Sequence, residues 1–300
     1  NDRTQGGAHM YYEFQEPYWL ARRSGFNLNV AQQNNLDGDK IGQGINLNMW
    51  HDLHNYWGFW MGLDHNFESY DDLETRGGPP MKSPASSSWA MDVWADDRMA
   101  VSGWYGTNVR WGLGGDNLST WNGLELELKP ASNIEIEVNP SFNYDRNDAQ
   151  WVENVDADGD DEDDRFIFGE LKNKVFELGI RGTLAFTPVL STQLFLQPFV
   201  TTGDYGRIKE LSRGGSYQFT DYDGLEENPD FRRRSLRFNL VVRWEYAPGS
   251  TIFVVWQQNR DRDFDDIRDP DFEPLADAGR SFTDEGDNIF LVKVNKWMGL

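Results

Sequence analysis

The 300-residue chain carries 50 acidic and 28 basic side chains, and its net charge of −22 disfavours nucleic acid and anionic headgroups, whose phosphates require clustered Lys and Arg. Because it has no cysteine, disulfides, thiolate nucleophiles and cysteine-based zinc sites are excluded. Hydrophobic residues make up 38% of the chain and aromatic residues 14%, a pairing expected of a transmembrane β-barrel, in which alternate residues face lipid and aromatic girdles mark both interfaces.

Apolar and polar residues alternate with a period of two along the chain, which predicts a nearly all-β fold. The pattern is regular in "GINLNMW" (44–50), "LELELK" (124–129) and "NIEIEVN" (133–139). Because bacterial barrels close with an even number of strands, we expect about 14, the missing one lying in a loop or upstream of residue 1. The thirteen that we count lie near residues 10–19, 23–33, 43–53, 57–69, 88–96, 98–110, 119–129, 133–145, 175–187, 190–202, 234–247, 250–260 and 287–298.

Strand length and loop asymmetry favour a membrane. Strands of about 9 to 13 residues exceed the usual 5 or 6 and suit a tilted strand that crosses a bilayer. Short connections near 95–98, 129–132, 187–191 and 247–250 alternate with long loops near 70–87, 146–174, 203–233 and 261–287. Outer-membrane barrels have short periplasmic turns and long outer loops.

These patterns predict one domain over residues 1–300, an antiparallel transmembrane β-barrel in the outer membrane of a Gram-negative bacterium. Its partners would be the lipid bilayer and lipopolysaccharide, and it would bind no nucleic acid. The long loops would be extracellular and the C-terminus periplasmic. Residues 1–20 lack the basic and apolar regions of a signal peptide, so we expect a mature or truncated start. A large soluble β-sandwich with a solvated polar face is the alternative.

If the apolar faces meet lipid, the charged faces line the lumen. The acidic candidates lie on one hairpin and the basic ones on later strands. Opposed charges could pair across the barrel and close it, or could create a transverse field in a water-filled pore; the sequence leaves both open. The lumen-lining candidates are Glu125, Glu127, Glu135, Glu137, Arg181, Arg237, Arg243 and Lys293.

The segment "VDADGDDEDDR" (155–165) is the most concentrated charge feature. Asp156, Asp158 and Asp160 follow a D-x-D-x-D spacing, so their oxygens could converge on calcium. The EF-hand pattern is incomplete, because its twelfth position is Ile167 rather than Glu. A solvated acidic loop tip is the alternative, and no other cofactor is predicted.

Catalytic motifs are absent from the sequence, and the four histidines show no metal-binding spacing. Glu127 and Glu135 could approach the separation of glycosidase carboxylates, but Glu alternating with Leu is also typical of a lumen face. We therefore predict no enzyme, with glycoside hydrolysis as the alternative. Loop aromatics could stack on sugar rings at the outer mouth or pack the loops together; they are Tyr217, Phe219, Tyr222, Phe264 and Phe272.

Several stretches together resemble the C-terminal region of a bacterial family called domain of unknown function 5916. They are "FESYDDLETRGGPPMKSPAS" (67–86), "NDAQWV" (147–152), "TLAFTPVLSTQLFLQPFVTTGDYGRIKEL" (183–211), "RSLRFNLVVRWEYAPGSTIFVVWQQNR" (234–260) and "NIFLVKVNKWMG" (288–299). The resemblance runs from about residue 10 to the C-terminus. It implies an outer-membrane barrel and a glycan-related context, and no catalytic residues.

The chain departs from the family pattern in two respects. A carbohydrate-binding-like domain that usually precedes the barrel is absent, and the last residue is Leu300 rather than an aromatic residue. We predict a porin-like conduit, or a membrane anchor for a surface assembly. The alternative is a carbohydrate-binding or glycan-processing outer-membrane protein.

Overall fold

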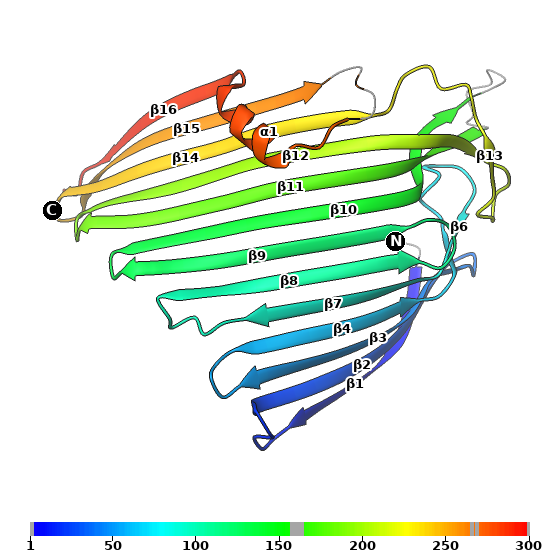
Figure 1. Cartoon of the computed structure of the whole chain (residues 1–300), viewed down its shortest axis with the longest axis horizontal. Helices are drawn as coiled ribbons and strands as arrows, with labels where there is room; N and C mark the ends of the chain where they lie inside the picture. Colours follow the sequence, from blue (N-terminus) through cyan, green and yellow to red (C-terminus); the bar gives the residue numbers. More distant parts are fainter. Residues whose placement is uncertain (1–2, 157–164, 265–266, 268–269, 299–300) are drawn as a thin grey trace.

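The protein is built on one large antiparallel sheet (Figure 1). The computed structural model describes residues 3–156, 165–264, 267 and 270–298. Thirteen strands follow one another in sequence order across the sheet, and β13 (Phe219–Asp221) pairs with β12 beside this path. The thirteen are β1 (Arg3–Phe14), β2 (Ala21–Asn35), β3 (Lys40–Leu53), β4 (Gly58–Asn66), β7 (Ser86–Trp94), β8 (Val101–Gly112), β9 (Leu118–Ala131), β10 (Ile134–Val155), β11 (Arg165–Thr187), β12 (Leu190–Leu211), β14 (Phe231–Ala247), β15 (Ser250–Phe264) and β16 (Gly286–Asn295).

The all-β prediction is confirmed, and each of the thirteen predicted strands overlaps a strand of the sheet. Strands β10, β11 and β12 are longer than expected, at 22, 23 and 22 residues, and extend into the predicted loops 146–174 and 203–233. Register shifts add extra residues to β10 near Asn147 and Trp151 and to β12 near Tyr205. A β-bulge breaks the period-two alternation, so the extended part does not read as a strand.

The remaining elements are short. Strands β5 (Ser69–Asp71) and β6 (Met81–Ser83) form a separate hairpin. Helix α1 (Pro274–Arg280) begins with Pro at its first turn, where the missing N–H costs nothing, and continues into the 3-10 turn η1 (Ser281–Thr283). No helix in the described part of the chain is long and apolar enough to cross a membrane.

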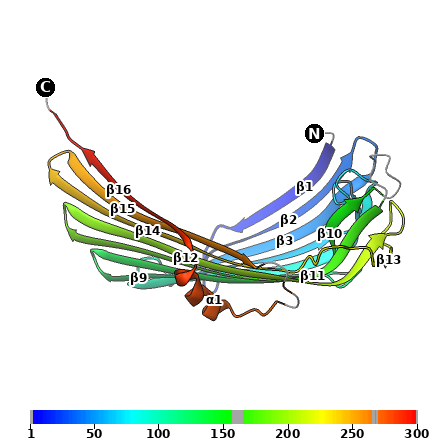
Figure 2. The same ribbon diagram turned by 90° about the horizontal axis from the view of Figure 1, so that it is seen from above.

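The sheet is bent into a trough with α1 on its convex side (Figure 2). Helix α1 contacts Arg232 and Arg234, which share a strand face with Leu236 and Leu240 because β14 pairs without a register shift from residue 231 to 245. The apolar face is therefore the convex one. The opposite, polar face lines the concave side.

Buried apolar side chains are few for a chain of this length. One cluster, Met81, Ala149, Phe166, Phe168 and Leu211, lies at the end of the sheet where the long connections meet. In the middle of the sheet the convex face has no second layer among the described residues. Leu124, Ile136, Ile180 and Leu240 are accordingly half-exposed there instead of sharing a dry interior.

Strands β1 and β16 form the two edges, and no pairing joins them within the described residues. The connections at one end are short, at 15–20, 54–57, 95–100, 132–133, 188–189 and 248–249. At the other end, residues 67–85, 212–230 and 265–285 make long connections. At the same end, residues 36–39 and 113–117 make short connections, so the asymmetry predicted from the sequence is present only in part.

Candidate functional site: the concave face

All eight predicted lumen residues lie on the concave face. The register sets Glu127 opposite Glu137, and Glu137 opposite Arg181. The same register places Phe195 of β12 opposite Arg181, and Asn239 of β14 opposite Phe195. Period-two alternation then puts the others on the same side, namely Glu125, Glu135, Arg237, Arg243 and Lys293.

Their ion pairs are local rather than opposed across the sheet. Arg181 lies 3.3 Å from Glu137 on the neighbouring strand, and this pair alone joins the predicted acidic and basic groups among the described residues. Arg237 pairs with Asp261 at 2.7 Å and Arg243 with Glu245 at 3.1 Å. The Arg181–Glu137 and Arg237–Asp261 pairs therefore link neighbouring strands, whereas the Arg243–Glu245 pair lies within β14; all three are partly exposed and contribute little to stability.

Five tryptophans lie over glycines on this face, a feature that our sequence analysis missed. Gly25, Gly58, Gly62, Gly106 and Gly123 are buried although the face is open, because an indole covers each of them. A Cβ atom built on any of the five would approach a ring atom to between 2.3 and 2.6 Å, closer than van der Waals contact allows. We call this set the indole track; it comprises Trp50, Trp60, Trp94, Trp104 and Trp121.

The sequence signal for the track is a Trp-x-Gly repeat. It occurs at Trp60-Met61-Gly62, at Trp104-Tyr105-Gly106 and at Trp121-Asn122-Gly123. Residues i and i+2 share a strand face, so the indole can lie along the strand over the missing side chain. The other two pairs, Trp50 with Gly25 and Trp94 with Gly58, are directly opposite across neighbouring strands.

An amide ladder borders the track on β2, β3 and β4. The Asn29 amide donates to Asn27 and Asn46, each at 2.8 Å. The Asn46 amide donates to Asp64 at 2.8 Å, and the Asn48 amide donates to Asn27 at the same distance. This part of the concave face therefore combines flat aromatic surfaces with an ordered row of hydrogen-bonding groups.

At the long-connection end, a cavity of about 750 Å³ separates the segment 71–86 from the concave face. Polar residues of the sheet line one side of it, among them Ser119, Asp145 and Asn173. Beside it, the buried Lys209 ammonium lies 3.2 Å from Asp148 and 4.4 Å from the Phe219 ring centre. A buried ammonium requires such a partner, and the pair links β12 to β10 at this end of the sheet.

The predicted sugar-stacking aromatics have packing partners in the structure. Tyr217 and Phe219 pack against the buried cluster, and burial raises the pKa of the Tyr217 hydroxyl. Tyr222 lies under Arg165, and three arginine side chains lie over the ring of Phe264. Phe272 contacts Phe142, with 5.9 Å between ring centres.

The predicted calcium site lies mostly outside the described residues. Asp158 and Asp160 belong to the undescribed segment, and Asp156 directly follows β10. Within the described ranges, no group of three or more metal-ligating side chains is found. The calcium prediction is untested.

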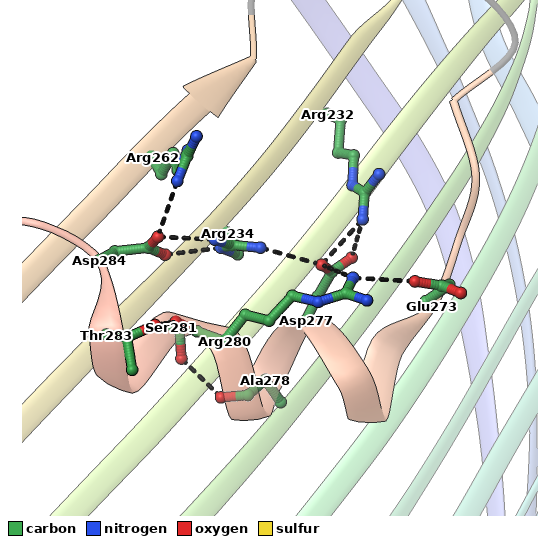
Figure 3. A network of polar contacts seen from close by, with 10 residues as sticks. All are labelled: Arg232, Arg234, Arg262, Glu273, Asp277, Ala278, Arg280, Ser281, Thr283 and Asp284. Atoms are coloured by element: carbon green, nitrogen blue, oxygen red, sulfur yellow. Dashed lines mark hydrogen bonds and ion pairs between the residues drawn. The ribbon is translucent and has the colours of Figure 1, made fainter.

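On the convex face, a network of arginines and carboxylates fastens α1 to β14 and β15 (Figure 3). Asp277 is fully buried and accepts hydrogen bonds from Arg232 at 2.6 and 2.8 Å and from Arg234 at 3.1 Å. Asp284, also buried, accepts two bonds of 2.6 Å from Arg234 and one of 3.3 Å from Arg262. Arg234 thus bridges both carboxylates, an arrangement suited to its planar, forked guanidinium.

Docking of α1 is expected to weaken in acid. The hydrogen bonds from Arg234 hold the pKa of the Asp284 carboxyl below its usual range. A carboxyl whose pKa is lower in the folded than in the unfolded protein stabilises the folded state at pH values above its unfolded pKa of about 3.9. This stabilisation is lost as the pH falls through the folded-state pKa. Amide exchange in residues 274–283, corrected for its intrinsic pH dependence, should be constant from pH 7 to 5 and should accelerate below pH 4. A constant corrected rate down to pH 2.5 would contradict this.

The fold and the concave face define an all-β protein built on one large antiparallel sheet, with an apolar convex face and a polar concave face. The chain belongs to the family described as "Domain of unknown function (DUF5916)", whose model matches residues 1–298. The resemblance noted in the sequence is thereby confirmed over nearly the whole chain. No curated protein matches the chain.

Proposed function

We propose that the chain spans the outer membrane of a Gram-negative bacterium as an antiparallel β-barrel and forms a conduit across it. In this proposal the convex face meets acyl chains and the concave face lines a water-filled lumen. The edges β1 and β16 find hydrogen-bond partners through closure of the barrel, since unpaired backbone groups are costly in lipid. We propose no catalytic activity.

The observation that carries the proposal is the exposed apolar convex face. A soluble sheet buries such a face against a second layer, which the described residues do not provide. Because large contiguous apolar patches are rare on soluble monomers, lipid is the covering that suits this one. Side chains of the convex face that are at least one-third exposed include Val30, Ile45, Leu47, Met49, Leu63, Leu126, Phe142, Val254 and Val292.

The connections supply the orientation. Short turns at one end of the sheet suit the periplasmic side, and the long connections suit the extracellular side. Strand β16 runs toward the short-turn end, so the C-terminus would be periplasmic. The buried cluster, the cavity beside segment 71–86 and α1 would then lie outside the bilayer, on the extracellular side.

A conduit is favoured over a passive anchor because the concave face is polar along its length. Asn46, Asn48 and Asp64 of the amide ladder are half-exposed on this face, and Glu125 is exposed there. An anchor needs no such lining. Carbohydrate recognition is the second candidate, and the indole track is the observation that favours it.

Substituted cysteines test the conduit, because the natural chain has none. Glu125 and Leu126 are neighbours on β9, both exposed, on the concave and convex faces respectively. In planar bilayers, a charged water-soluble thiol reagent should change the current of the Glu125→Cys protein and leave that of Leu126→Cys unchanged. Absence of any steady, salt-dependent current would leave an anchor, and equal reactivity of both cysteines would contradict the assignment of faces.

A further inference from the structure

The indole track has the geometry of a ligand-binding surface. Each of the five rings is half-buried against a glycine on the concave face, and the Arg23 guanidinium lies over Trp50, 5.4 Å from its ring centre. The rings span five neighbouring strands, from β3 to β9. Trp50 is paired with Trp60 and Trp94 with Trp104, and the Trp104 and Trp121 ring centres are 5.6 Å apart.

The track is costly for a purely structural purpose. Glycine in a strand weakens it, because it adds conformational entropy to the unfolded chain and provides no side chain to pack. All five glycines nevertheless lie in strands of the sheet, where indoles cover them. Burying these rings in a core would stabilise the fold more, so the exposed part of the indole track points to a ligand.

A cavity adjoins the turn end of the track. Its volume is about 370 Å³, within the usual range for small-molecule sites. Trp94 and Trp104 form its aromatic wall, and hydrogen-bonding side chains surround them. The polar lining consists of four carboxylates, one guanidinium and two hydroxyls, from Asp52, Asp97, Glu125, Glu127, Arg22, Tyr56 and Ser102.

We infer that the indole track binds the pyranose rings of neutral oligosaccharides as they pass through the conduit. The C–H bonds on a pyranose face carry partial positive charge, and the face of an indole is negative, so the two stack. Hydroxyls at the ring edge donate to carboxylates and accept from amides. This inference rests on the proposed function, because it requires that water and solutes reach the concave face.

Other ligand classes fit the track less well. A cage for a quaternary ammonium needs rings that surround the cation, whereas these rings follow one another across one face of the sheet. Nucleic acid and uronic-acid glycans would meet the carboxylates of Glu125, Glu127 and Asp52, with Arg22 in the cavity lining and Lys129, already paired with Glu127 at 2.8 Å, as counter-charges. A neutral ligand with a flat apolar face and hydroxyl edges satisfies both the rings and the carboxylates.

Calorimetry on the full detergent-solubilised chain tests the inference with neutral hexasaccharides of glucose, mannose, xylose and N-acetylglucosamine, and with an oligogalacturonate for comparison. We expect at least one neutral hexasaccharide to bind, and Trp104→Ala to reduce its affinity at least tenfold. Trp244→Ala, which removes a half-exposed indole from the convex face, should change the affinity less than twofold.

Glycine variants separate ring position from ring presence. In Gly123→Ala the new Cβ would lie 2.5 Å from Trp121, so the indole must tilt away, and the affinity should fall at least threefold although every tryptophan is retained. Gly182→Ala is the matched control, because its Cβ would meet no atom closer than 3.8 Å. Unchanged affinity in both Trp104→Ala and Gly123→Ala would overturn the inference.

Bilayer recordings distinguish this failure from that of the conduit. Steady current without block by any neutral hexasaccharide, and without calorimetric binding, would overturn the inference and leave the conduit. Binding that depends on Trp104 in a protein that carries no current would support the track and refute the conduit. Preferential binding of the oligogalacturonate would overturn the assignment to neutral glycans.

Discussion

Replacing Arg234 by alanine is expected to release α1 from the sheet and to accelerate amide exchange in residues 274–283 by about 100-fold or more. Arg234 is buried and bonds to both Asp277 and Asp284, which are buried as well. Removing one partner of a buried ion pair costs about 3–5 kcal/mol because a charge is left uncompensated. A seven-residue helix is not stable alone, so its protection from exchange reports docking.

Arg280→Ala provides the matched control. Arg280 belongs to the same network and contacts Asp277 at 3.2 Å, but its side chain is half-exposed. Asp277 would keep its bonds from Arg232 and Arg234, so exchange should be nearly unchanged. If Arg234→Ala behaved like Arg280→Ala, Arg232 and Arg262 alone would suffice to hold the two carboxylates.

Leu240→Arg is expected to destabilise the protein folded in lipid by about 2–4 kcal/mol, the cost of an arginine near the middle of the lipid face of a barrel. Leu240 lies on the convex face of β14, about midway along the strand. Folding into phosphatidylcholine vesicles, followed by denaturant titration, measures the free energy of unfolding. The expected loss would appear as a lower denaturant midpoint.

Gln257→Arg is the control for this substitution. Gln257 lies on β15, one strand away and at nearly the same depth, but its exposed side chain is on the concave face. An arginine there would project into water in the proposed lumen, so the free energy of unfolding should change little. Equal losses in the two variants would remove the distinction between a lipid face and a lumen face.

Sequence periodicity predicted the strands well where nothing interrupts the alternation. Residues 124–129 of β9 and 236–246 of β14 follow the pattern almost residue by residue, because each side chain there faces only one environment. The outer part of β10 was missed because extra residues near Asn147 and Trp151 shift its alternation. Three-residue strands such as β13 are too short to display any period.

Helix α1 and its network depend on long-range contacts that no local pattern contains. Arg234 and Asp284 are separated by 50 residues, and the sequence "DFEPLADAGR" before Asp284 is too short for a clear helical period. The eight lumen candidates were placed on one face because alternation needs only local information. Their partners were not predicted, since these depend on register between strands.

If the protein is the conduit proposed above, the position of α1 bears on how flow through it is regulated. The helix is fastened to the outside of the wall, so its release would leave the cross-section of the passage unaltered. The segment 71–86 instead overhangs the concave side, held there by contacts that include the burial of Met81. A constriction that opens and closes should therefore be sought in that overhang and not in the helix.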